Sequence, residues 1–185
     1  MKKYFVLETL AEERIDAELD REIREMLAVC FPESPDKFRS ERVWHNTRPQ
    51  FSVIHRDRSG QILGHVAVVI RSITFGWNSC NNVASIQGVA VAEECRGFGL
   101  AEQLIARALE EAVYEGYQYA ILFCKEPLVP FYRKIGWKLT DDSVVMRNLD
   151  DNPILMRSNC PMYKELGKSP FPEGPVDVHT PKPVE

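Results

Sequence analysis

The fold is decided by the stretch Val89-Ala-Val-Ala-Glu-Glu-Cys-Arg-Gly-Phe-Gly-Leu-Ala101. Its first residues end an apolar run, 83–91, which is typical of a strand buried on both faces of a sheet. Its last residues begin a segment, Leu100–Tyr114, in which apolar residues recur at helical spacing, and Gly116 supplies a stop signal. The stretch therefore predicts a strand, a Gly-rich turn and a helix in direct succession.

The neighbouring segments predict the rest of a sheet. Another apolar run, Tyr119–Cys124, follows the helix, so the two strands should be parallel with a right-handed crossover. Upstream, the runs 51–56 and 61–70 flank the turn signal 57–60 and predict a β-hairpin. Together these patterns predict an α/β fold with a central mixed β-sheet flanked by helices.

The N-terminal third is expected to hold a short strand at Lys3–Leu7 and an amphipathic helix at 11–31. The charges along that helix, at positions 12 to 25, are interpreted as a solvated face. The polar stretch 33–50 follows and is expected to be a loop with one short helix.

The C-terminal part predicts a short helix at 129–135 and strands at 137–139 and 144–146. Residues 168–185 hold five of the twelve prolines. Such a segment is not expected to form a helix or a central strand, because proline lacks the backbone N–H. We therefore expect one domain over 1–167, followed by a Pro-rich tail that is extended or packed on that domain.

Composition excludes several classes of function. With 23 Lys and Arg against 27 Asp and Glu, the net charge of −4 argues against a nucleic-acid partner. No apolar run approaches the ~20 residues of a membrane span, and the N-terminus lacks a signal-peptide pattern. The five cysteines include no C-x-x-C pair, so the sequence gives no reason to expect a metal. These features predict a cytoplasmic protein with neither a nucleic-acid nor a membrane partner.

The turn itself suggests a phosphate site. Glycines let the backbone approach a ligand closely, and the N-terminus of the helix attracts anions. Arg96 would add a fork of donors. The dinucleotide motif G-x-G-x-x-G fails because Glu102 stands at the third glycine position, and the P-loop motif is absent. On the turn alone, an ordinary strand-to-helix connection is an equally good interpretation.

The sequence on both sides of the turn resembles the GNAT superfamily of acetyl-CoA-dependent N-acetyltransferases. The segment 96–101 matches the R-x-x-G-x-[GA] pyrophosphate motif of that family, and 131–137, Phe-Tyr-Arg-Lys-Ile-Gly-Trp, looks like its F-Y-x-x-x-G-[FW] signature. The resemblance implies the GNAT fold and direct transfer of an acetyl group from acetyl-CoA to an amine in a ternary complex. It implies that acetyl-CoA is bound by Val89, Ala90, Val91, Arg96, Gly97, Phe98, Gly99, Leu100 and Ala101.

Two catalytic positions follow from the same resemblance. Tyr132 matches the tyrosine that protonates the departing coenzyme thiolate. Gln87 stands where many relatives have a glutamate base, and an amide does not accept a proton usefully, so Gln87 would order a water or bind substrate. The replacement bases that the sequence leaves open are Asp36, Glu41, His45, His65 and Glu126.

Other reactive side chains have structural interpretations. His65 lies in an apolar run and is expected to be a hydrogen-bonded core histidine. Cys95 and Cys124 are expected to be small buried residues, because no Cys-His-acid arrangement can be assembled from their spacing.

Weaker local resemblances concern the acceptor and the donor. Segments 18–26, 64–71 and 88–91 are similar to aminoglycoside 2′-N-acetyltransferases, and 48–51 and 171–175 to the nodulation N-acyltransferase. The expected acceptor is a primary amine of a small molecule, such as an amino sugar or aminoglycoside. A longer-chain N-acyltransferase and a non-catalytic acyl-CoA-binding protein are the alternatives. The resemblance leaves a homodimer open, since dimers are common in this fold.

Overall fold

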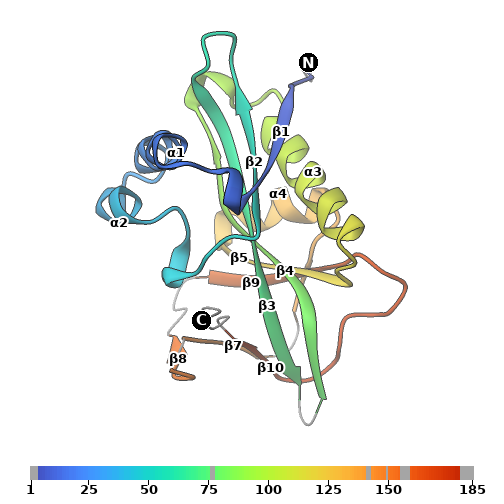
Figure 1. Cartoon of the computed structure of the whole chain (residues 1–185). Helices are drawn as coiled ribbons and strands as arrows, with labels where there is room; N and C mark the ends of the chain where they lie inside the picture. Colours follow the sequence, from blue (N-terminus) through green and yellow to red (C-terminus); the bar gives the residue numbers. More distant parts are fainter. Residues whose placement is uncertain (1–3, 76–77, 141–142, 149, 155–158, 180–185) are drawn as a thin grey trace. The chain divides into compact units, whose positions relative to one another are not determined.

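The computed structural model describes residues 4–75, 78–140, 143–148, 150–154 and 159–179. The chain divides into two compact units, residues 1–69 with 86–111 and residues 70–85 with 112–185. Three elements contribute residues to both units (Figure 1): β3 (Ile62–Phe75), β4 (Asn78–Val91) and α3 (Leu100–Tyr114).

The strands of the first unit are antiparallel. β2 (Phe51–Arg56) pairs with β3, which confirms the predicted hairpin, and β1 (Leu7–Ala11) pairs with the other edge of β2. The prediction of an opening strand at Lys3–Leu7 is wrong, because the strand begins where that prediction ends. β2 ends at Arg56 and Leu7 lies opposite His55, so residues before Leu7 have almost no strand left to pair with.

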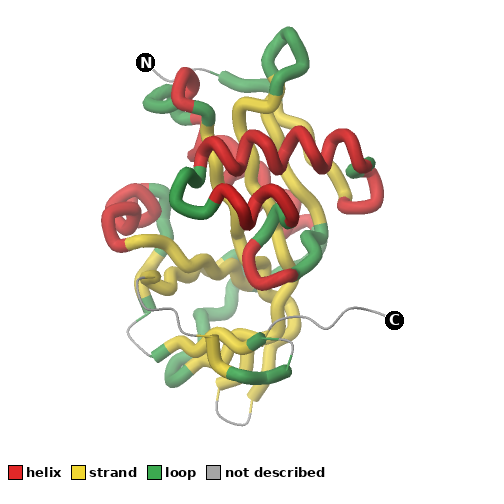
Figure 2. The backbone as a smooth tube through the Cα atoms, turned by 90° about the vertical axis from the view of Figure 1, so that its left-hand side faces the viewer, coloured by secondary structure: helices red, strands yellow, loops and turns green. Residues whose placement is uncertain are grey.

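Two helices and two 3-10 turns lie between β1 and β2 in the first unit. α1 (Ala17–Cys30) begins later than predicted, because Glu12–Arg14 form a 3-10 turn, η1, and the Asp16 carboxylate then caps the helix by accepting hydrogen bonds from its first turn. The short helix expected in the loop is α2 (Pro35–Ser40), which is followed by the 3-10 turn η2 (Trp44–Asn46). Figure 2 shows α1 and α2 side by side.

The core of the first unit lies on both faces of its strands. Ile23 and Leu27 of α1, Phe38 of α2 and Ile54 of β2 are fully buried in one cluster. The opposite face receives α3, and Figure 1 shows α3 across the strands from α1 and α2. Gly64 makes this contact possible, because a Cβ atom there would lie 2.9 Å from a methyl group of Leu104.

The second unit contains the parallel pair that the sequence predicts. β5 (Tyr119–Lys125) is parallel to β4, and its other edge pairs antiparallel with β9 (Asn159–Glu165), a strand that the sequence analysis missed. β9 also pairs with β6 (Lys138–Leu139). Between β5 and β6 lie the 3-10 turn η4 (Glu126–Leu128) and the predicted short helix, α4 (Val129–Lys134).

The C-terminal segment corrects a prediction. β10 (Val176–His179) lies between β3, to which it is antiparallel, and β7 (Val144–Arg147), to which it is parallel. It is therefore an interior strand, although the proline content of the segment predicts none. The prolines stand at 170, 172, 175, 181 and 183, so they flank the strand and remove no donor from its ladder.

The sheet combines both pairing modes, since parallel and antiparallel neighbours occur within it. Its main hydrogen-bonding order is β6-β9-β5-β4-β3-β10-β7-β8, where β8 is Pro153–Ile154, and β1 and β2 join through β3. The predicted fold class, a mixed β-sheet flanked by helices, is confirmed. Among the described residues, no helix is long and apolar enough to cross a membrane.

Candidate active site

The Gly-rich turn joins β4 to α3 through two glycines in left-handed backbone conformations. After β4, Glu93–Cys95 form the 3-10 turn η3, and α3 begins at Leu100. Gly97 and Gly99 have φ values of 77° and 87°, which L side chains rarely adopt. A Cβ atom on Gly97 would meet nothing within 4 Å, so the space in front of the turn is open to a ligand. The first N–H groups of α3 have no partner within the helix, as at any helix start.

Arg96 makes its described contacts on the α1 side of the turn. Its Nε donates a hydrogen bond to the carbonyl oxygen of Val91, 3.0 Å away. Burial raises the pKa of the Cys30 thiol, and the positive charge of the nearby Arg96 guanidinium opposes this rise. The side chain thereby lines a groove of about 980 Å³ whose other walls include Met26, Val29 and Ile62. Glu93 and Glu94 of η3 are exposed to solvent.

β4 brings Gln87 and Gly88 beside the loop that follows α2. Gln87 is buried, and its Oε1 accepts a hydrogen bond from the backbone N–H of Trp44 over 2.8 Å. Gly88 has a φ of 57°, and a Cβ atom there would lie 3.3 Å from the ring of His65. The strand residue that replaces the expected base therefore holds the loop. A glutamine inside an apolar strand is expected to be buried, and a buried amide needs a hydrogen-bond partner. This is the only signal in the sequence for the contact between Gln87 and the loop.

His65 is a core histidine, as predicted. Its side chain is fully buried, and its Nδ1 lies 2.8 Å from the carbonyl oxygen of Gly88. Because a carbonyl only accepts, Nδ1 carries the proton and Nε2 is the unprotonated nitrogen. Burial lowers the pKa of His65 to about 4. The imidazole is therefore neutral at pH 7.

Aromatic packing fixes η2. The Trp44 ring lies edge-on to the rings of Phe31 and Phe38, with centroids 6.4 and 5.2 Å away. The hydroxyl of Thr47 donates to the Trp44 carbonyl oxygen over 3.0 Å. Between these anchors, His45 adopts a left-handed backbone conformation with a φ of 66°, which is uncommon for a residue other than glycine.

The three carboxylates that the sequence leaves open as general bases lie in or next to α2 and in η4. Asp36 forms an exposed ion pair with Arg39, and Glu41 forms a partly buried one with Lys37, both at 2.6 Å. Glu126 is exposed in η4 of the second unit. None of these three carboxylates is buried.

Tyr132 is buried in the second unit, with 6% of its surface exposed. Its ring makes edge contacts with Phe131 and Trp137, at centroid distances of 5.0 and 6.2 Å. Burial raises the pKa of the phenol well above its usual 10, and the nearby Cys124 raises it further. The phenol therefore keeps its proton throughout the physiological pH range. Tyr132 lies in a different unit from the Gly-rich turn at 96–99, which is called the Arg96 turn below.

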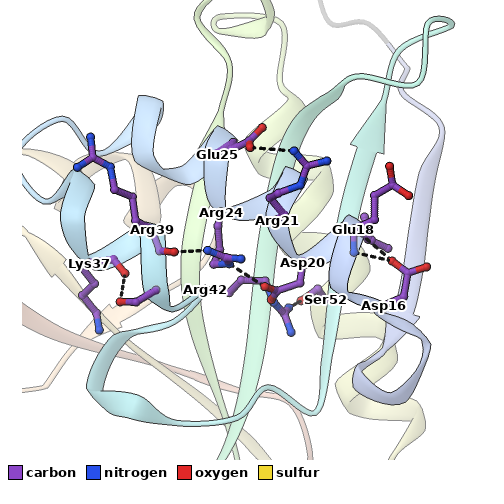
Figure 3. A network of polar contacts seen from close by, with 12 residues as sticks. Asp16, Glu18, Asp20, Arg21, Arg24, Glu25, Lys37, Arg39, Arg42 and Ser52 are labelled. Carbon is purple, nitrogen blue, oxygen red and sulfur yellow. Dashed lines mark hydrogen bonds and ion pairs between the residues drawn. The ribbon is translucent and has the colours of Figure 1, made fainter.

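A buried ionic network was not predicted from the sequence. Arg42 is 7% exposed, and its guanidinium donates to Asp20 (2.6 Å) and to Ser52 (Figure 3). It also donates to Glu12. It joins η1, α1 and β2 next to the loop that carries Trp44. The interpretation of the early charges as a solvated face is therefore wrong for Glu12 and Asp20, because both carboxylates lie against this buried cation.

A comparison with protein families identifies the class of the protein. Residues 14–140 match the family described as "Acetyltransferase (GNAT) domain". This match spans more than half of the chain, and the protein belongs to the GNAT acetyltransferase family. It is a GNAT-type acyltransferase, a class that uses acyl-CoA as co-substrate. None of the curated proteins matches the chain.

Solved structures share the fold. The GNAT family N-acetyltransferase YhbS from Escherichia coli, in complex with CoA, has a TM-score of 0.63 and 19% identity over 97% of this chain and 93% of that one. An aminoglycoside 6′-N-acetyltransferase complexed with coenzyme A has a TM-score of 0.62 and 15% identity, over 91% and 99% of the two chains. Escherichia coli ElaA has a TM-score of 0.63 and 13% identity, over 88% and 100%. The local resemblance to 2′-N-acetyltransferases and to the nodulation enzyme stays a prediction.

Proposed function

We propose that this protein transfers the acetyl group of acetyl-CoA to a primary amine of a small molecule, by direct attack in a ternary complex. The observation that carries the proposal is the turn at 96–99, with two glycines at positive φ in front of the first turn of α3. Residues 1–167 would act as one acetyltransferase domain. The segment 168–185 would be packed on it, in keeping with the pairing of β10.

In this proposal the turn binds the pyrophosphate of acetyl-CoA. The backbone N–H groups of Gly97, Phe98, Gly99, Leu100 and Ala101 converge at the positive end of the α3 dipole. The open space at Gly97 supports this role, since any side chain there would project into the site. Arg96 supports the turn through Val91 as well as adding positive charge.

The reacting thioester would lie along the last residues of β4. The backbone of Val89, Ala90 and Val91 would hold the pantetheine arm by strand-like hydrogen bonds, and an N–H group would polarise the thioester carbonyl. The neutral amine attacks that carbon, the C–S bond breaks, the sulfur leaves as a thiolate, and the nitrogen releases its extra proton to water as the amide forms. Tyr132 would then protonate the thiolate, because a phenol that is kept neutral by burial is an available proton donor.

The amine must arrive without its extra proton. Gln87 is not a base, and its Oε1 is engaged by Trp44. We therefore assign Gln87 the role of positioning the loop that carries Trp44 and of ordering a water beside it. Turnover should accordingly rise with pH toward the pKa of the acceptor amine. The net charge of −4 supports a cationic acceptor such as an amino sugar or aminoglycoside.

Calorimetry with acetyl-CoA tests the proposal. We expect micromolar binding by the wild-type chain at fixed salt, weakened by about 1.5–3 kcal/mol in Arg96→Ala, the range for a hydrogen bond to a charged group. Arg133→Ala removes an exposed cation from α4 and serves as the control that leaves binding unchanged. Absence of binding by the wild type would refute the proposal and favour an acyl-carrier donor.

A further inference from the structure

Two cysteines of the second unit face each other across a strand pair. In the antiparallel register of β5 and β9, Cys124 lies directly opposite Cys160. Directly opposite residues share a face of the sheet and have Cα atoms about 4.5 or 5.5 Å apart. A disulfide spans Cα distances of about 4.4–6.8 Å. Both side chains are thiols in the structure, and the backbone already holds them at bridging distance.

The two thiols differ in environment. Cys124 is 5% exposed, and its Sγ lies 3.7 Å from the Sδ of Met162, whereas Cys160 is only partly buried. Burial raises the pKa of Cys124 to about 11, with a smaller contribution from the Cys160 thiol. Cys124 is therefore protonated at neutral pH, which makes Cys160 the thiol that an oxidant in solution meets first.

We infer that Cys124 and Cys160 form a peroxide-sensitive modification site that closes to a disulfide. In the first step the Cys160 sulfur attacks a peroxide oxygen, the O–O bond breaks, and Cys160 becomes a sulfenic acid as water or an alcohol leaves. In the second step the Cys124 sulfur attacks the Cys160 sulfur, the S–O bond breaks, and the Cys124 proton leaves with the hydroxyl as water. The peroxide is reduced and the two thiols are oxidised. A dithiol reverses the bond by thiol–disulfide exchange.

The bond would affect Tyr132. Cys124 is close enough to Tyr132 to contribute to the raised pKa of the phenol. Moving its sulfur toward Cys160 changes the packing beneath α4, and close-packed interiors respond to such changes. If the proposed function holds, oxidation should lower kcat about tenfold or more, in line with loss of an acid catalyst. The Arg96 turn lies in the other unit, so acetyl-CoA binding should persist.

Mass spectrometry of the full chain tests the site directly. The chain is treated with hydrogen peroxide, remaining thiols are alkylated, and the protein is digested with trypsin. We expect the tryptic peptides 108–125 and 158–164 to appear linked, at a mass two hydrogens below their sum, and to separate after dithiothreitol. The link should be absent from Cys160→Ser and from both Cys124→Ser and Cys124→Ala, with circular dichroism verifying that each variant is folded.

Other outcomes overturn the inference. Alkylation of both cysteines after peroxide, a Cys160 that stops at the sulfonic acid, or links to other cysteines in place of this one would each contradict it. A second readout separates this inference from the proposed function. If the link forms and kcat stays constant, the effect on Tyr132 is refuted while the modification site stands. If the reduced chain binds no acetyl-CoA, the proposed function fails whatever the cysteines do.

Discussion

The Arg96 turn and the surroundings of Tyr132 are built in opposite ways. The turn is formed by backbone, with two glycines at positive φ and an open approach at Gly97. Tyr132 is a buried side chain that depends on the rings of Phe131 and Trp137 around it. A backbone site tolerates many side chains but not a change of backbone conformation, whereas a buried phenol depends on one functional group. The two regions should therefore fail separately when each is mutated.

The largest expected effect is on turnover. Tyr132→Phe removes the proposed proton donor but keeps the ring, so we expect kcat to fall about 10²- to 10⁴-fold. The KM for acetyl-CoA should stay within about twofold, because the turn is the proposed binding site for acetyl-CoA. Steady-state kinetics with Tyr163→Phe as a control, a tyrosine of β9, checks the split. A parallel rise in KM would show that the two regions are not independent.

The next effect is on stability. Arg42→Ala leaves the carboxylate of Glu12 buried without its cation, and we expect the free energy of unfolding to fall by about 3–5 kcal/mol. Arg39→Ala is the matched control, because its ion pair with Asp36 is exposed and should contribute at most about 1 kcal/mol. Urea unfolding measures both. Equal losses in the two variants would contradict the role assigned to the buried network.

The burial of His65 should also make the stability of the fold depend on pH. Burial lowers its pKa from 6.5 to about 4, so the unfolded chain takes up this proton first as the pH falls. The stability contribution is complete above pH 6.5 and is lost toward pH 4, by about 3 kcal/mol in all. His65→Asn, which keeps a donor for Gly88, should flatten this part of the profile. An unchanged slope between pH 6.5 and 4 would exclude His65 as its source.

The smallest expected effect is on acetyl-CoA binding and comes from a substitution in the Arg96 turn. Gly97→Val forces a β-branched side chain into a φ of 77°, at a cost of about 1–3 kcal/mol, and fills the approach to the turn. Gly116→Val is the control, because Gly116 has a φ of 91° and equally open surroundings at the far end of α3. Calorimetry should show weaker acetyl-CoA binding for Gly97→Val alone. Equal weakening in both variants would mean that strain, and not the site, controls binding.

Features that depend on local sequence could be predicted, whereas contacts between distant segments could not. The turn and α3 depend on local signals, namely glycine positions and helical periodicity, and both lie where they were expected. The network on Arg42 joins residues 12, 20, 42 and 52, and the opposition of Cys124 and Cys160 depends on the register of a strand that was not predicted. Such contacts are fixed by packing between distant segments, which no local pattern encodes. β10 was not predicted, because the prolines on both sides of it argue against a strand although its own residues alternate between apolar and polar.

The most direct test of the account is detection of acetylated product. The purified full chain is incubated with acetyl-CoA and a panel of amino sugars, aminoglycosides and simple amines, and the products are identified by mass spectrometry while free CoA is counted. The account predicts an N-acetylated amine with one CoA released per acetyl group, and a much slower reaction in Tyr132→Phe. Binding of acetyl-CoA without any acetylated amine across the panel would contradict it.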